Sequence, residues 1–211
     1  MNLRGLYLLT PDYYGEGFFQ KLQLALDAGI DLLQYRDKSN PYGVKLDVAK
    51  RIRQITVDYD VPFIIDDDPA LAGECYADGV HVGRDDPTIA EVRDVLGDVI
   101  IGYSTYGDIQ RALQGQKDGA SYVAFGSFFP TKSKEGAELC DLSVLGEAKK
   151  LLNIPIFAIG GINENNVGQI MQYGISGVAV ISSIFSSADP FNACRRLRNE
   201  IEKSMVPGFK C

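Results

Sequence analysis

The stretch FIIDDDPALAGECYADGVHVG, residues 63–83, contains two short apolar runs separated by a segment of helical length. The first run, residues 63–65, ends in three adjacent acids at 66–68, and the second run occupies residues 79–83. Nearly continuous apolar runs of this length are typical of parallel strands that are buried on both faces. The stretch therefore predicts a strand, a helical crossover and a second strand parallel to the first.

The same alternation extends over the whole chain. Segment 42–59, for example, carries an apolar stripe through Leu46, Ala49, Ile52 and Ile55, as an amphipathic helix would. Eight βα repeats without a linker predict a single (β/α)8 TIM barrel, whereas a doubly wound open sheet usually has fewer strands. The expected strands are 5–10, 32–37, 63–67, 79–83, 100–104, 122–126, 156–160 and 177–182. The expected helices are 18–28, 42–59, 89–96, 108–116, 142–152, 164–173 and 190–203.

The composition is that of an ordinary globular protein, with 211 residues, 45% hydrophobic residues and a net charge of −7. The acidic balance argues against a nucleic-acid partner, and no apolar stretch approaches the length of a membrane helix. The four scattered cysteines indicate reduced thiols, so we expect a cytoplasmic protein. We expect one barrel domain over residues 1–205 and a loose tail over 206–211, with a homo-oligomer left open.

Polar side chains collect where each expected strand ends, at the rim on which barrel enzymes carry their chemistry. The cations among them suit phosphate oxygens, the hydroxyls can donate hydrogen bonds, and a Gly-Gly pair at 160–161 lets backbone N–H groups approach a phosphate. These features predict small phosphorylated substrates. The residues concerned are Arg36, Lys38, Ser104, Thr131, Lys132, Ser133, Lys134, Gly161 and Ser182.

Asp67 and Asp86 follow neighbouring strands and could share one hard divalent ion. Magnesium takes one or two carboxylates, keeps several waters and bridges substrate phosphates. The sequence therefore predicts one Mg²⁺ per site. A helix start is the competing interpretation of the acid triplet, and Asp68, which precedes Pro69, is the member that best fits a helix cap.

The motifs at these strand ends resemble those of the thiamine-phosphate synthase family over almost the full chain. They are QYRDK at 34–38, GVHVGRDD at 79–86, YVAFGSFFPTKSK at 122–134 and AIGGI at 158–162. The resemblance implies a TIM barrel that joins hydroxymethylpyrimidine diphosphate to a thiazole phosphate and releases pyrophosphate. The family's reaction is described as dissociative, so it needs a stabilised leaving group and a well-placed nucleophile.

The resemblance also implies roles for individual residues. Asp67 and Asp86 should bind Mg²⁺, while Arg36, Lys38, Ser104 and Lys134 should act on the departing diphosphate. The pyrimidine diphosphate should be held by Gln34, Tyr35, Arg36, Asp37, Lys38, Asp66, Ser104 and Lys134. The thiazole phosphate should be held by Thr131, Lys132, Ser133, Gly161, Ile181 and Ser182.

Three positions depart from the family's commonest pattern. Asp66 stands where Asn is usual, Asp68 where Arg is common, and Arg84 where Gln is frequent. An ionised Asp66 cannot donate a hydrogen bond to the pyrimidine, as an amide can. It would have to accept from the pyrimidine amino group, be protonated, or turn toward metal or backbone, and Arg84 could balance its charge.

Two other functions fit the same scaffold. A thiazole tautomerase would need a proton shuttle but not the magnesium acids, and a non-catalytic phosphate-ligand sensor would bind without joining two substrates. His81 is the single histidine, and its alternation with Val80 and Val82 points it to the opposite face of the strand. A hydrogen-bonded structural role for His81 is favoured over acid-base catalysis.

Overall fold

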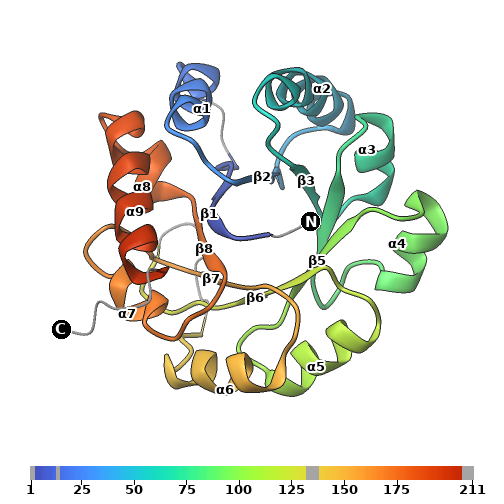
Figure 1. The fold of residues 1–211 in the computed structure, drawn as a ribbon. Helices are drawn as coiled ribbons and strands as arrows, with labels where there is room; N and C mark the ends of the chain where they lie inside the picture. The colour runs from blue at the N-terminus through green and yellow to red at the C-terminus, as the bar shows by residue number, and fades with distance from the viewer. Residues whose placement is uncertain (1–2, 13–14, 132–137, 206–211) are drawn as a thin grey trace.

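The structure is a computed structural model that describes residues 3–12, 15–131 and 138–205. Eight parallel strands form a closed barrel in sequence order, with β1 paired to β8, and Figure 1 shows the helices arranged around this ring. This confirms the predicted (β/α)8 barrel. The strands are β1 Gly5–Leu9, β2 Leu32–Tyr35, β3 Phe63–Asp66, β4 Gly79–Val82, β5 Ile100–Ser104, β6 Tyr122–Phe125, β7 Ile156–Ile159 and β8 Gly177–Val180. The helices are α1 Phe18–Asp27, α2 Tyr42–Asp58, α3 Pro69–Glu74, α4 Ile89–Leu96, α5 Ile109–Lys117, α6 Ser143–Leu151, α7 Val167–Met171, α8 Ser182–Phe185 and α9 Pro190–Met205.

Each expected strand is found, but most end one or two residues earlier than the apolar pattern indicated. The polar residues at the strand ends leave the sheet and enter the rim loops. Strand β8 ends at Val180 because Ser182 begins the short helix α8, and helix α7 covers only part of the expected 164–173. The expected tail, 206–211, lies outside the described residues.

The barrel separates two apolar layers, as alternation along parallel strands requires. One layer lies between the strands and the helices, and the other fills the barrel interior, where Tyr7, Tyr122 and Phe157 pack edge to face with ring centroids 5.4–5.7 Å apart. In β4, Val80 and Val82 face outward into a cluster beneath α4. His81 therefore points inward, as its alternation predicted.

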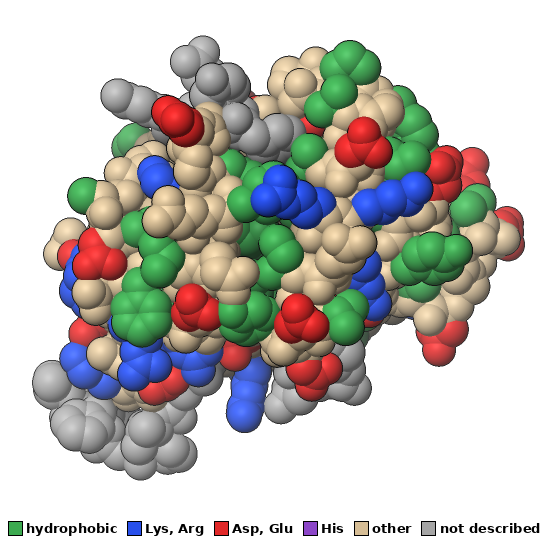
Figure 2. Space-filling model, turned by 90° about the horizontal axis from the view of Figure 1, so that it is seen from above, with side chains coloured by type: hydrophobic (Ala, Val, Ile, Leu, Met, Phe, Trp, Pro, Cys, Tyr) green, Lys and Arg blue, Asp and Glu red, His purple; other side chains and the backbone are tan. Residues whose placement is uncertain are grey.

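Charged side chains of both signs lie on the outer surface (Figure 2), as the composition indicates. Figure 2 shows acidic and basic side chains intermingled on one side of the molecule. Among the helices in the described ranges, none combines the length and apolarity needed to cross a membrane.

Helix α3 begins where the acid triplet ends. The Asp68 carboxylate accepts a hydrogen bond from the Leu71 N–H at 2.9 Å, and Pro69 occupies the first helical position. An N-cap oxygen satisfies a backbone donor that has no partner within the helix, and proline is tolerated there because its missing N–H is not needed. The predicted capping role of Asp68 is confirmed.

We expect Asp68→Ala to lower the free energy of unfolding by about 1 kcal/mol, because the Leu71 N–H loses its acceptor. Urea denaturation followed by circular dichroism measures this change. Asp68→Asn is the matched control, since an amide oxygen can still cap the helix, and it should keep most of the stability. Equal losses in the two variants would contradict the capping role.

Candidate functional site

A cavity of about 610 Å³ opens at the rim formed by the C-terminal ends of the strands. Residues from most of the strands reach it, although they are distant in sequence. Most of the site residues predicted from the sequence lie in its wall. These are Gln34, Arg36, Lys38, Asp66, Asp67, Asp86, Ser104, Thr131, Gly161, Ile181 and Ser182.

The QYRDK segment contributes alternate residues to the cavity. Gln34, Arg36 and Lys38 line it, whereas Tyr35 and Asp37 point away. Tyr35 is buried in the outer apolar layer and its hydroxyl donates to Asp37 at 3.2 Å. The structure therefore does not bring Tyr35 and Asp37 into the cavity wall with the other three, because side chains along an extended segment alternate between its two sides.

Asp37 organises the loop that leads to α2. Its carboxylate accepts hydrogen bonds from the backbone N–H groups of Ser39 and Asn40, both at 3.0 Å, and from the Asn40 side chain at 3.1 Å. A buried carboxylate requires such donors, and Asp37 is only 8% exposed. Its contacts indicate that Asp37 shapes the loop that carries Arg36 and Lys38.

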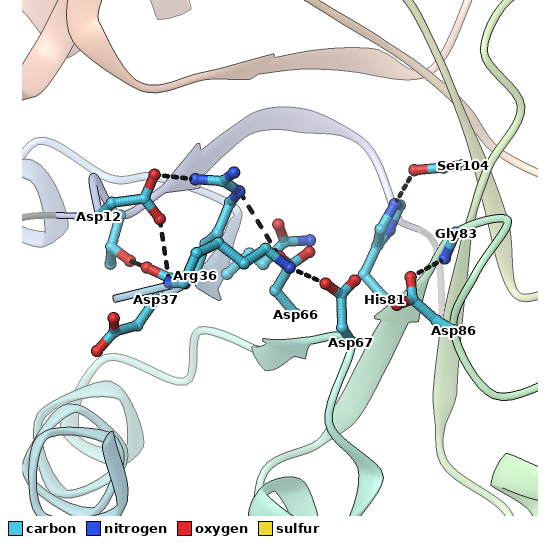
Figure 3. A network of polar contacts seen from close by, with 12 residues as sticks. Asp12, Arg36, Asp37, Asp66, Asp67, His81, Gly83, Asp86 and Ser104 are labelled. Atoms are coloured by element: carbon cyan, nitrogen blue, oxygen red, sulfur yellow. Dashed lines mark hydrogen bonds and ion pairs between the residues drawn. The ribbon is translucent and has the colours of Figure 1, made fainter. Parts of the chain in front are cut away.

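Acidic and basic side chains alternate along one wall of the cavity (Figure 3). Arg36 pairs with Asp12 and lies 3.6 Å from the Asp66 carboxylate. The Lys38 ammonium is 2.9 Å from Asp66 and also pairs with Asp67. We call this series Asp12–Arg36–Asp66–Lys38–Asp67 the charge ladder. The charge ladder relieves the repulsion between the adjacent acids Asp66 and Asp67, because each of its carboxylates faces a cation.

The charge ladder also shows which cations surround Asp66, the acid that stands where the family usually has Asn. The ion-pair partners found for Asp66 are Arg36 and Lys38. The Arg84 guanidinium instead lies over the Tyr106 ring, 5.0 Å from its centroid. This cation–π contact leaves Arg84 at the edge of the cavity, next to Asp85 and Asp86.

The two predicted metal ligands are held by their backbone surroundings. Asp67 has a left-handed backbone with φ 62°, which Asp tolerates better than most residues, and its N–H donates to the His81 carbonyl at 2.8 Å. One oxygen of Asp86 accepts a hydrogen bond from the Gly83 N–H at 2.7 Å. Both carboxylates line the same cavity from the segments that follow the neighbouring strands β3 and β4.

These donors fit a magnesium ion that is completed by substrate and water. In the described ranges there is no cluster of three or more His, Cys, Asp or Glu side chains that could hold a metal alone. Magnesium is commonly bound through one or two carboxylates together with phosphate oxygens and water. The Lys38 ammonium, which already pairs with Asp67, shows that this carboxylate attracts positive charge.

The opposite wall of the cavity is built from backbone and hydroxyl groups. Gly160 and Gly161 have positive φ angles, and a β-carbon on Gly161 would lie 2.6 Å from the Pro130 carbonyl oxygen. The two loops meet closely here because the Phe129 N–H donates to the Gly160 carbonyl at 3.1 Å. Thr131 therefore reaches the cavity beside Gly161, while the predicted residues Lys132, Ser133 and Lys134 lie outside the described residues.

Sequence reasoning missed several residues of the site. Tyr7 lies inside an apolar strand and carried no polar signal, and Ser127 sits within an aromatic segment. Asp12 follows β1 at the expected rim, but its place in the sequence did not identify Arg36 as its partner. His81 lines the cavity and contacts Ser104 through a ring nitrogen at 2.9 Å.

The fold and the cavity together define a (β/α)8-barrel enzyme whose rim is equipped for anionic ligands. Comparisons with known proteins narrow this class. The family model described as "Thiamine monophosphate synthase" matches residues 6–184. The chain belongs to the thiamine monophosphate synthase family and is an enzyme of the transferase class.

Individual relatives are similar over nearly their full lengths. The thiamine-phosphate synthase of Picrophilus torridus is 47% identical over 203 residues, which cover 96% of this chain and 99% of the relative. That of Thermoplasma acidophilum is 50% identical over 93% of this chain and 92% of its own. The solved thiamine phosphate pyrophosphorylase of Pyrococcus furiosus superimposes with a TM-score of 0.89 at 33% identity, covering 97% of this chain and 98% of that one.

Proposed function

We propose that this enzyme joins hydroxymethylpyrimidine diphosphate to a thiazole phosphate, giving thiamine phosphate and pyrophosphate. The observation that carries the proposal is the division of the cavity into two walls. One wall holds the charge ladder with Asp86, which suits a diphosphate and its metal, and the other holds Thr131, Gly161 and Ser182, which suit a single phosphate.

The reaction breaks the bond between the pyrimidine methylene carbon and the diphosphate oxygen. Both bonding electrons leave with pyrophosphate, and the thiazole nitrogen then donates its electron pair to the methylene cation. No proton has to be removed in these two steps, so the chain needs charge stabilisation more than acid-base groups. When bound by Asp67 and Asp86, Mg²⁺ would supply positive charge to the diphosphate oxygens.

Positively charged side chains of the protein stabilise the departing diphosphate. Arg36 can offer paired N–H donors to phosphate oxygens, and Lys38 offers a compact positive charge beside it. Both already line the cavity, held by Asp12, Asp66 and Asp67. The resemblance of the sequence to the family implies that Lys134 assists the same leaving group.

The apolar part of the cavity protects the reactive intermediate. A methylene cation exposed to water would be captured by it, which gives the wrong product. Ile159, Ala179 and Ile181 line the cavity next to the wall assigned to the thiazole, and the first two belong to the ends of β7 and β8. Their side chains exclude water from the space between the two walls.

The tautomerase alternative accounts less well for the site. A tautomerase transfers protons and has no need of Asp67, Asp86 and the charge ladder that faces them. The single histidine is engaged with Tyr122 and Ser104 by hydrogen bonds of 3.0 and 2.9 Å. These contacts favour the synthase.

The purified protein, given both substrates and Mg²⁺, should form thiamine phosphate and pyrophosphate in equal amounts. Chromatography of thiamine phosphate and a coupled pyrophosphate assay measure the two products, and a chelator should abolish both. Omission of either substrate is the control. Failure to form thiamine phosphate at any Mg²⁺ concentration would refute the proposed function.

Asp67→Asn and Asp86→Asn should each lower kcat by about two orders of magnitude, because each removes a charge that would hold the metal. Calorimetry should also show weaker Mg²⁺ binding when the pyrimidine diphosphate is present. Asp68→Asn is the matched control, because it removes a neighbouring charge outside the cavity wall and preserves the helix cap. If all three variants behaved alike, the metal assignment would be wrong.

Lys38→Met should tighten divalent-cation binding to the substrate-free protein severalfold, because the ammonium no longer competes for Asp67. Titration with Mn²⁺ followed by electron paramagnetic resonance measures this directly. The same variant should lose synthase activity because the diphosphate loses a cation. Lys45→Met, on the outer helix α2, is the control, and weaker Mn²⁺ binding in Lys38→Met would contradict the competition.

A further inference from the structure

A continuous chain of hydrogen bonds crosses the floor of the cavity. The Gln34 side-chain N–H donates to the Tyr7 hydroxyl at 2.6 Å, and the Tyr7 and Tyr122 hydroxyls are 2.7 Å apart. The Tyr122 hydroxyl is 3.0 Å from His81 Nδ1, and His81 Nε2 is 2.9 Å from Ser104 Oγ. The chain thus connects two cavity residues, Gln34 and Ser104, through the barrel interior.

The barrel is shaped to accommodate this chain. Tyr7 and Tyr122 are almost completely buried, with exposed fractions of 1% and 0%, and His81 is 7% exposed. Gly102 on β5 lies between His81 and Tyr122 in the strand register. A β-carbon on Gly102 would lie 2.3 Å from His81 Nδ1 and 2.2 Å from the Tyr122 ring, so only glycine leaves room for their hydrogen bond.

Each member of the chain has a limited choice of roles. An amide N–H can only donate, so the Tyr7 oxygen accepts from Gln34. Burial raises the pKa of both Tyr7 and Tyr122, which keeps each phenol protonated. Among the described residues, the partner to which the Tyr7 hydroxyl can donate is Tyr122, because its other contact, Gln34, is already the donor.

The donor and acceptor of each remaining hydrogen bond, from Tyr122 to Ser104, follow in the same way. Tyr122 accepts from Tyr7 and therefore donates its own proton to His81 Nδ1. His81 then carries its proton on Nε2, which donates to Ser104 Oγ. With its oxygen acting as an acceptor, Ser104 keeps its hydroxyl proton for a partner in the cavity.

We propose that His81 is a positioning residue that holds the Ser104 hydroxyl as a hydrogen-bond donor toward the anionic substrate, in a direction set by Gln34, Tyr7 and Tyr122. A reversed chain would direct the Ser104 proton toward His81 and present a lone pair to the diphosphate. The effect on catalysis rests on the proposed function, but the direction of the hydrogen-bond chain does not.

The direction can be measured without any activity, because the protein has a single histidine. Selective ¹⁵N labelling of histidine gives one imidazole, whose two nitrogens report which of them is protonated. We expect His81 to carry its proton on Nε2 in the substrate-free protein. A proton on Nδ1 would overturn the proposal, whether or not the protein proves to be a synthase.

The catalytic consequence is tested with Tyr122→Phe, which removes the donor to His81 Nδ1 and keeps the ring. We expect kcat/KM for the pyrimidine diphosphate to fall about tenfold, as for loss of one hydrogen bond to a charged group, while KM for the thiazole phosphate stays unchanged. Tyr103→Phe is the matched control. Tyr103 lies on the neighbouring strand β5, where its ring packs under Arg111 outside the cavity wall, so this variant should keep full activity.

A double-mutant cycle separates positioning from general damage to the barrel. If Tyr122 acts through Ser104, adding Tyr122→Phe to Ser104→Ala should change kcat/KM by less than about twofold. Two losses that multiply would show that Tyr122 acts independently of Ser104 and would overturn the proposal. Thermal denaturation of each variant identifies any that fails to fold, and in that case the histidine labelling of the unmodified protein decides.

Discussion

Closure of the sheet between β1 and β8 is the constraint on which the rest of the structure depends. Gly5 pairs with Gly177 at this seam, and a β-carbon on Gly177 would lie 2.2 Å from the Gly5 carbonyl oxygen. The two strands can approach this closely because Gly177 has no side chain. Once the ring of parallel strands is closed, all eight C-terminal ends share one rim. Gln34 and Ser182, which are far apart in sequence, line the same cavity for this reason.

The rim tolerates crowded acids because cations are placed between them. The Asp66 side chain is only 11% exposed and has the Lys38 ammonium 2.9 Å away. Partly buried ion pairs add little net stability, since desolvation offsets much of their attraction. The charge ladder therefore matters mainly for orientation. Cations already held in the cavity lose less conformational entropy when an anionic ligand binds, so the ladder preorganises the site for diphosphate.

The periodic parts of the chain could be predicted from sequence because burial on both faces imposes a readable pattern on each strand. Helix α8, with four residues, is too short to carry such a pattern, and it replaced the expected end of β8. The rim residues could be found because polar groups interrupt apolar runs there. The ion pair of Arg36 with Asp12 could not be derived, because it joins two loops whose approach depends on the closed barrel.

The floor of the cavity shows how stability and function share the same residues. Buried hydroxyls are unfavourable unless they are hydrogen-bonded, and those of Tyr7 and Tyr122 satisfy each other and two flanking side chains. The edge-to-face packing of their rings with Phe157 fixes where those hydroxyls lie. The apolar interior thus determines the geometry of the polar floor above it. Gly102 is an example of this dependence. It does not line the cavity, but any side chain at this position would displace His81.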